Sequence, residues 1–146
     1  MLYEIRQDTV AEVLTAVVAA RTTWEELPNV WPAMLGEVYD SLEQLNVGKA
    51  GRNVMFYKDD LPSLEVGVEV SKAFTSVGRV SPSALPGGSV ATTIHRGPYQ
   101  GLASAHQAVH HWCRARGLKI VGPRWEVYGH ILDGVEPETT VSWLLE

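Results

Sequence analysis

The residues best suited to chemistry lie near the end of the chain, in the segment Arg124–Tyr128. Alternation along a strand places Glu126 and Tyr128 on one face, with Trp125 and Val127 on the other. A carboxylate at the floor of an aromatic cleft can balance a cationic ligand or act as a general base on water. Tyr128 can then donate a hydrogen bond to oxygen charge that develops on a substrate. The alternative is a glutamate at a sheet edge that faces water.

An equivalent pair lies earlier in the chain, in the segment Asn53–Tyr57. Counting back from the two tyrosines, Met55 stands where Glu126 stands, and Tyr57 stands where Tyr128 stands. One half of the chain therefore offers a carboxylate and a phenol, and the other half a thioether and a phenol. This asymmetric set suits a cleft for a flat, apolar molecule with a polar tip. Simple packing of the first-half pair is the alternative.

Further aromatic side chains are candidates for the walls of a cleft. Trp31 opens one predicted helix, Tyr99 begins another, and Trp143 alternates with apolar residues in the last predicted strand. Both tryptophans can stack on a ligand, although packing in the core explains each of them more simply. We expect seven ligand-binding residues, the first two of which are also the catalytic candidates: Glu126, Tyr128, Tyr57, Met55, Trp31, Trp143 and Tyr99.

Two histidines raise the question of a metal site. His106 and His110 are four residues apart and share a helix face, and Cys113 follows three residues later. A fixed third ligand and an H-E-x-x-H motif are both missing from the sequence. We therefore expect no metal and no cofactor, and we interpret the histidines as solvated residues at a rim. Cys113 as a nucleophile needs an activating partner such as His110, whereas a cysteine beside an apolar helix face is usually a small core residue.

The composition is that of a small globular chain and excludes several classes of protein. The 146 residues, 45% hydrophobic and 20% charged, suffice for one domain. The net charge of −5 is opposite to that of most proteins that bind nucleic-acid phosphates. No apolar run approaches the roughly 20 residues of a membrane helix, and the start lacks a signal sequence. With a single cysteine as well, we expect a cytoplasmic protein without direct nucleic-acid or membrane contact.

The order strand, helix, strand, strand is predicted to occur twice. The segment Val10–Ala20 fits either a helix or a buried strand, and the repeat favours a strand. A run rich in Gly, Pro and Ser, about 77–88, is the predicted linker between module one, about 1–76, and module two, about 89–146. The predicted elements are strands at 2–7 (an edge strand), 10–20, 53–57, 64–70, 89–95, 124–128 and 139–145, and helices at 31–44 and 99–116.

Two tandem βαββ modules imply an α+β fold with pseudo-two-fold symmetry. We expect a single domain over 1–146, in which one antiparallel sheet carries two main helices. A cleft forms where the modules meet, and small-molecule sites favour such clefts. The oligomeric state does not follow from these patterns.

Several motifs, in the same order, resemble those of the GyrI-like domain family, also called the effector-binding domain of bacterial transcription activators. His95–Trp112 resembles the pattern "hydrophobic-x-x-G-P-Y-x-x-L". Gly122–Ile131 resembles the strand "G-P-x-x-E-x-Y", and the final VSWLLE is similar to the closing strand. Phe56–Asp60, followed by Leu64–Val70, resembles the hairpin "Y-x-D-x … E-V-G-V". The resemblance covers essentially the whole chain.

The resemblance implies a ligand cleft in which Glu126 is the pocket glutamate. Relatives fused to a helix-turn-helix domain bind lipophilic, often cationic drugs, and some standalone members hydrolyse the cyclopropane ring of DNA-alkylating natural products. We therefore expect a binder of hydrophobic cationic or electrophilic compounds, which either returns its ligand unchanged or hydrolyses it with Glu126 as general base. The alternative is a protein-interaction module of the gyrase-inhibitor type, with acidic pairs such as Glu25-Glu26 and Asp59-Asp60 as contact points.

Overall fold

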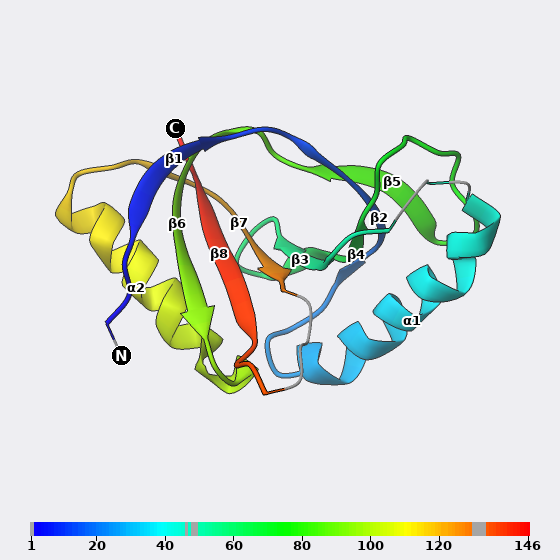
Figure 1. The fold of residues 1–146 in the computed structure, drawn as a ribbon, viewed down its shortest axis with the longest axis horizontal. Helices are drawn as coiled ribbons and strands as arrows, with labels where there is room; N and C mark the ends of the chain where they lie inside the picture. Colours follow the sequence, from blue (N-terminus) through cyan, green and yellow to red (C-terminus); the bar gives the residue numbers. More distant parts are fainter. Residues whose placement is uncertain (1, 46, 48–49, 130–133) are drawn as a thin grey trace.

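The structure is a computed structural model that describes residues 2–45, 47, 50–129 and 134–146. It is an α+β fold in which eight antiparallel strands form one sheet (Figure 1). The elements are β1 (Arg6–Val10), β2 (Val13–Arg21), α1 (Leu27–Leu45), β3 (Asn53–Tyr57), β4 (Ser63–Glu69), β5 (Val80–Leu85), β6 (Gly88–Arg96), the 3-10 turn Tyr99–Gly101, α2 (Leu102–Ala115), β7 (Ile120–Tyr128) and β8 (Glu138–Leu145). Neither described helix has the length and apolar character that a membrane crossing requires.

The sheet is symmetric in element order about its centre. Its strands follow the order β1-β6-β8-β7-β3-β4-β2-β5, so that β3 and β7 pair in the middle. One strand–helix–strand–strand unit lies on each side, with α1 and α2 at opposite ends of the molecule (Figure 1). The predicted α+β fold, with an antiparallel sheet and two main helices, is confirmed. From Val13 onward the ambiguous segment at 10–20 is a strand, as the repeat predicted.

The two ends of the sheet differ from the prediction. Val80–Leu85, within the predicted linker, forms β5 and pairs with β2. The linker prediction is wrong there because an edge strand needs donors on one side only and therefore tolerates Pro82. The predicted edge strand at 2–7 lies instead at Arg6–Val10, paired with β6. β1 and β5 thus each precede one unit and pair with the other, which ties the two halves together.

Both helices begin at residues other than those predicted. α1 starts at Leu27, after a turn in which the Thr23 hydroxyl accepts a hydrogen bond from the Glu26 N–H at 3.1 Å. Pro32 therefore lies inside α1 rather than in its first turn, and Trp31 lies in the second turn rather than at the start. α2 starts at Leu102, because the three preceding residues form a 3-10 turn.

Three apolar clusters hold the layers together. The first packs α1 on β2, β3 and β4 and includes Met34 and Val38, and the second packs α2 on β6 and β8 and includes Val109 and Cys113. The third covers the other face of the sheet, around Trp125. Met34 precedes Val109 by the same sequence interval as Val38 precedes Cys113, so the two helices present equivalent positions to the sheet.

Candidate functional site

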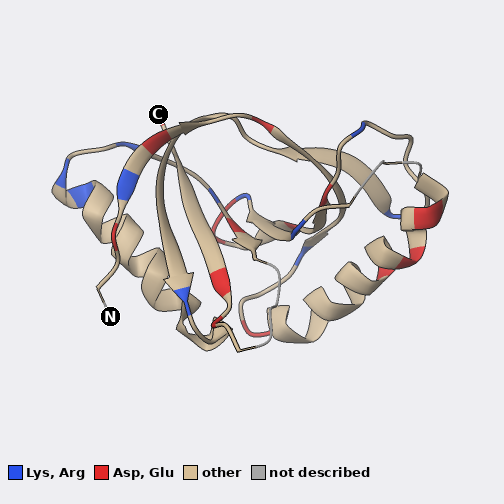
Figure 2. Cartoon of the chain, viewed as in Figure 1, with Lys and Arg blue, Asp and Glu red and all other residues tan. Residues whose placement is uncertain are grey.

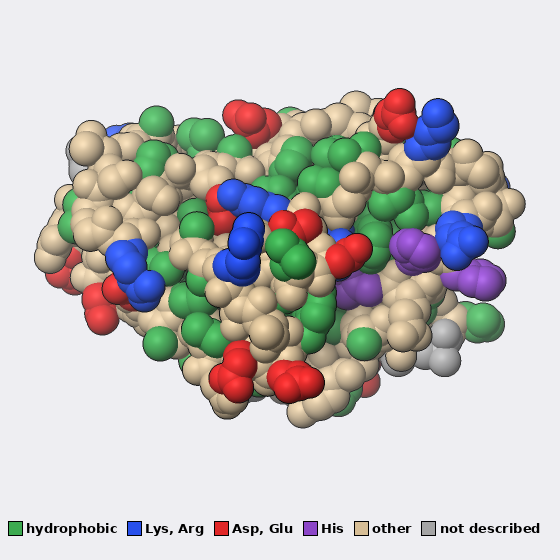
Figure 3. Space-filling view, turned by 180° about the vertical axis from the view of Figure 1, so that it is seen from behind, with side chains coloured by type: hydrophobic (Ala, Val, Ile, Leu, Met, Phe, Trp, Pro, Cys, Tyr) green, Lys and Arg blue, Asp and Glu red, His purple; other side chains and the backbone are tan. Residues whose placement is uncertain are grey.

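A cleft of about 2040 Å³ lies between the two helices, over the centre of the sheet. Both helices line it, together with β3, β7 and β8. Pockets for drug-sized ligands are typically about 300–1,000 Å³, so this cleft has room for a bulky compound. Seen from behind, hydrophobic side chains run across the middle of the molecule and histidines gather on the α2 side (Figure 3).

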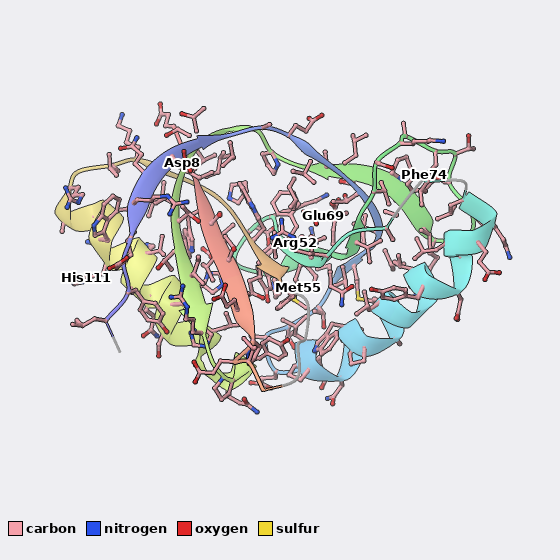
Figure 4. The ribbon with its side chains drawn as sticks, viewed as in Figure 1. Asp8, Arg52, Met55, Glu69, Phe74 and His111 are labelled. Carbon is pink, nitrogen blue, oxygen red and sulfur yellow. The ribbon has the colours of Figure 1, made fainter. Side chains whose placement is uncertain are left out.

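Glu126 lies at the floor of the cleft and is 4% exposed. It pairs in register with Met55 on the neighbouring strand, so the two positions that the repeat makes equivalent face each other across the centre of the sheet. Met55 lies between the helices in Figure 4. The predicted alternation is confirmed, because Tyr57 and Tyr128 line the cleft whereas Trp125 belongs to the cluster on the other face.

In the described part of the chain, three side chains contact the Glu126 carboxylate. The Tyr128 hydroxyl donates to Oε1, and the Tyr57 hydroxyl lies 3.4 Å from the same oxygen and 2.9 Å from the Met55 sulfur. His106 Nε2 lies 2.7 Å from Oε2. Burial, reinforced by the neighbouring carboxylate, raises the pKa of both tyrosines well above its ordinary value. Both phenols therefore stay protonated and serve as donors.

His106 is the residue that departs furthest from its predicted place. We expected it at a solvated rim, but its ring is held on both sides, by Glu126 and by the Trp143 indole nitrogen 2.9 Å from Nδ1. The tertiary fold brings these groups together from α2, β7 and β8. The internal repeat could have identified His106 as a cleft residue. The sequence interval between Trp31 and His106 equals the interval between equivalent buried residues of the two helices, and Trp31 was a predicted wall residue.

Beside His106 lie two further cleft residues that the sequence analysis did not predict, Arg124 and Trp24. Arg124 is buried and makes an ion pair of 2.7 Å with Asp60. Its guanidinium carbon lies 4.9 Å from the ring centre of Trp143 and 5.9 Å from that of Trp24. Trp24 donates its indole N–H to the Asp60 carbonyl at 2.9 Å and tilts against Tyr57. Neither Arg124 nor Trp24 was among the predicted site residues.

The structure brings all seven predicted site residues to the cleft lining. Trp143 is almost fully buried, Trp31 is 36% exposed on the α1 wall, and the half-exposed Tyr99 meets Tyr128 edge to face at 5.6 Å. Their contact with a ligand stays a prediction.

The histidines and the cysteine point in different directions. Cys113 is fully buried in the second cluster, where burial raises the pKa of its thiol. His106 is directed to Glu126, and His110 packs edge-on against Trp143 at 5.4 Å. In the described ranges, no group of three or more histidine, cysteine or acidic residues is placed to hold a metal.

The two walls of the cleft differ in chemistry. The α1 wall is apolar and aromatic, and the α2 wall is mostly polar. The α1 side consists of Leu27, Pro28, Trp31, Leu35 and Tyr39, and the α2 side of Leu102, Ala103, His106, Gln107, His110, His111, Arg114 and Ala115.

Several solved structures share this fold. The crystal structure of the EcmrR C-terminal domain has a TM-score of 0.81 at 18% identity, covering 100% of this chain and 99% of that one. In the EcmrR–DNA complex, the matched part is 58% of the EcmrR chain. SAV2435 bound to tetraphenylphosphonium has a TM-score of 0.71 at 13% identity, covering 100% and 94%. A hydrolase from Listeria innocua has a TM-score of 0.60 at 12% identity, covering 98% and 92%.

Sequence comparison identifies the family. A search of curated proteins found no match. The GyrI-like small molecule binding domain, however, matches residues 3–131, which is most of the chain and includes the cleft floor and both helices. The chain therefore belongs to the family of GyrI-like small molecule binding domains.

Proposed function

We propose that this small-molecule binding domain takes bulky hydrophobic cations, with Glu126 as their counter-charge. The observation that carries the proposal is a 4%-exposed carboxylate at the floor of an aromatic cleft. Within the described residues, no lysine or arginine is paired with it, and the nearby Arg124 is already paired with Asp60. A buried charge without an opposite charge is costly, and a bound cation offsets that cost.

The surroundings of Glu126 support the same ligand class. Faces of tyrosine and tryptophan rings attract cations, and Tyr57, Tyr128 and Trp143 all lie around the carboxylate. A carboxylate has about four lone-pair positions, of which Tyr57, Tyr128 and His106 use three. Among the residues that the structure describes, none occupies the fourth position, which is open to a ligand or a water. SAV2435, which shares the fold, was solved with the lipophilic cation tetraphenylphosphonium.

The test uses two probes of similar shape and different charge, methyltriphenylphosphonium and the neutral triphenylphosphine oxide. We expect the wild type to bind the cation more tightly by calorimetry. Glu126→Gln should weaken cation binding about 30-fold, or about 2 kcal/mol, and change oxide binding little. Equal losses for both probes, or no loss for either, would contradict the role of Glu126.

Hydrolysis of an electrophilic cyclopropane is the second candidate, supported by the contact between Glu126 and Tyr128. Glu126 would direct a water onto a ring carbon and take its proton, while the carbon–carbon bond that breaks leaves its electron pair on an activated system. Tyr128 would stabilise the oxygen charge that develops there. Such a substrate is already activated, so modest acid–base assistance suffices.

Turnover separates the two candidates. Purified protein would be incubated with a cyclopropane-bearing DNA alkylator, with Glu126→Gln and a protein-free sample as controls. The products would be identified by mass spectrometry. Catalytic formation of a water-added product, lost in the variant, would establish hydrolysis. Recovery of unchanged compound would exclude that substrate class and leave the binding proposal to the phosphonium titration.

The protein-interaction alternative receives less support. Asp60 is engaged by Arg124, and the Asp59 carboxylate accepts the backbone N–H groups of Ser63 and Leu61, which lower its pKa. This acidic pair thus has local structural roles. The buried, single Cys113 gives no support for an oxidising compartment, so we keep the cytoplasm as the proposed site of action.

A further inference from the structure

We propose that Trp143 sets the tautomer of His106 and thereby keeps the floor of the cleft negatively charged and selective for cations. The inference rests on the proposed binding of cations at Glu126 and assigns a positioning role to two residues beside it. His106 and Trp143 are 37 positions apart in the chain and meet only in the folded protein.

The tautomer follows from the hydrogen-bonding capacity of each group. An indole N–H can only donate, so the Trp143 nitrogen 2.9 Å from His106 Nδ1 requires that Nδ1 be an acceptor without a proton. The ring proton then resides on Nε2, which donates to Glu126 Oε2 at 2.7 Å. α2 therefore offers the carboxylate a hydrogen-bond donor that carries no charge.

A second proton on His106 would face an obstacle. Protonated Nδ1 would place two N–H groups head to head across 2.9 Å, and Trp143 would have to turn away. That ring is 8% exposed and is held between the guanidinium of Arg124 at 4.9 Å and the ring of His110 at 5.4 Å. The indole thus opposes the attraction of Glu126 for an imidazolium.

The other described groups around His106 do not supply a compensating charge. Tyr57 meets the ring edge-on at 6.1 Å, and Tyr128 shares the carboxylate; both phenols stay protonated. Arg124, across Trp143, disfavours further positive charge. The pair of Glu126 and neutral His106 therefore carries one negative charge, whereas an imidazolium at 2.7 Å would cancel it and leave nothing for a cationic ligand.

The arrangement is a property of the site and not a requirement of the fold. At the equivalent positions, one repeat interval earlier, module one has Trp31 and Val68 in place of His106 and Trp143. The helix interval also relates β4 to β8, because Val66 pairs with Met55 as Val141 pairs with Glu126, whereas the interval between β3 and β7 is four residues shorter. Module one folds without a histidine–tryptophan pair.

The tautomer can be read without any ligand. Long-range proton–nitrogen NMR correlations of the histidine rings distinguish a protonated from an unprotonated ring nitrogen, and loss of one set in His106→Gln assigns it. We expect His106 at pH 7 to show a protonated Nε2 and an unprotonated Nδ1. A protonated Nδ1, with Nε2 protonated or not, would overturn the inference even if the phosphonium binds as proposed.

Selectivity gives the second readout. The affinity ratio of methyltriphenylphosphonium to triphenylphosphine oxide should stay constant in the wild type from pH 8 to pH 6. In Trp143→Phe it should fall about fourfold over the same range, because the freed Nδ1 can take a proton as an ordinary imidazole does. The matched control is Trp112→Phe, a tryptophan on α2 that does not line the cleft and stacks with Arg116. A constant ratio in Trp143→Phe would overturn the inference.

A double variant distinguishes control of the His106 tautomer by Trp143 from a simple packing role of Trp143. Adding His106→Gln to Trp143→Phe keeps a neutral donor and removes the titrating ring, so the ratio at pH 6 should return to the wild-type value. Failure of this rescue would assign the loss to packing and overturn the inference. If neither probe binds the wild type, the proposed function fails, and the NMR experiment alone decides the tautomer.

Discussion

The two modules bury the same positions and line the cleft with different chemistry. Their buried faces are alike, with Leu27 of α1 matched by Leu102 of α2 at the common repeat interval. Their cleft faces are not, because Trp31 is matched by His106 and Tyr39 by Arg114. The core positions of both helices need apolar side chains because both helices pack on the sheet in the same way. A side chain that faces the cleft is not packed against the sheet and does not have this requirement.

The difference extends to the charge at and around the site. Glu126 pairs with Met55 at the centre of the sheet, so this pair of equivalent positions carries one carboxylate rather than two. Acidic residues gather along the outer part of α1, and basic residues lie at the end of α2 and just after it (Figure 2). A duplicated fold can therefore hold an asymmetric ligand with an apolar side and a charged point.

The largest expected change in stability tests whether the two modules are packed equally tightly at equivalent positions of β4 and β8. A Cβ on Gly67 of β4 would lie 1.8 Å from the Ala16 carbonyl oxygen, whereas its counterpart Ser142 fits and lies 3.0 Å from the Thr92 hydroxyl. Gly67→Ala should lower the free energy of unfolding by at least about 4 kcal/mol, and Ser142→Ala by about 1 kcal/mol. Urea denaturation measures both. Equal costs would show that the halves are packed alike at this position.

A second carboxylate on the floor would break the asymmetry. Met55→Glu should lower the free energy of unfolding by about 3 kcal/mol at pH 8, because burial and a like charge oppose ionisation. The pKa of the introduced carboxyl then lies above its unfolded value, so the stability is present at low pH and is lost as the pH rises. We expect a smaller deficit at pH 5. Met55→Leu, which keeps the volume, should cost less than about 1.5 kcal/mol at either pH.

The two tyrosines are the feature that both modules share at the site. Their pKa values in the folded protein are raised above the ordinary value of 10.0, mainly by burial. Above about pH 10 these tyrosine hydroxyls lose their protons in the unfolded chain but keep them in the folded protein. The free energy of unfolding therefore falls by about 1.4 kcal/mol per pH unit for each tyrosine. Urea denaturation from pH 9 to pH 11 measures the slope. Burial also raises the pKa of Tyr3 and of Cys113, which add to the slope. Tyr57→Phe should therefore reduce the slope above pH 10 by about 1.4 kcal/mol per pH unit, and an unchanged slope would contradict the burial effect.

The smallest effect concerns the apolar wall. Trp31→Ala should weaken binding of methyltriphenylphosphonium and of triphenylphosphine oxide by a similar factor, about tenfold or about 1.4 kcal/mol, since its contribution is contact area. Calorimetry with both probes measures it, and exposed Leu61, outside the lining, provides the control Leu61→Ala. A loss confined to the cation would place the charge recognition on both walls.

Much of the architecture was predictable because it is local or repeated. The alternation at 64–70 and the repeat of element order predicted two strands that are present as β4 and β2. The edge strand β5 was missed because its serines and proline are typical of a loop, and only pairing with β2 makes Val80–Leu85 a strand. The first residues of both helices were missed for a different, local reason, because a capping turn decided the start of α1 and a 3-10 turn the start of α2.

For the site, the sequence by itself determined that Glu126 and Tyr128 share a face and that Met55 is the counterpart of Glu126. Strand alternation and a repeat are properties of neighbouring or equivalent positions, so they can be read along the chain. Only the tertiary structure decided that His106 joins Glu126 to Trp143, and that Arg124 pairs with Asp60. These contacts join residues of different helices, strands and turns that are far apart in the sequence. Local periodicity does not indicate which of them meet, because that depends on how the two modules pair in the sheet.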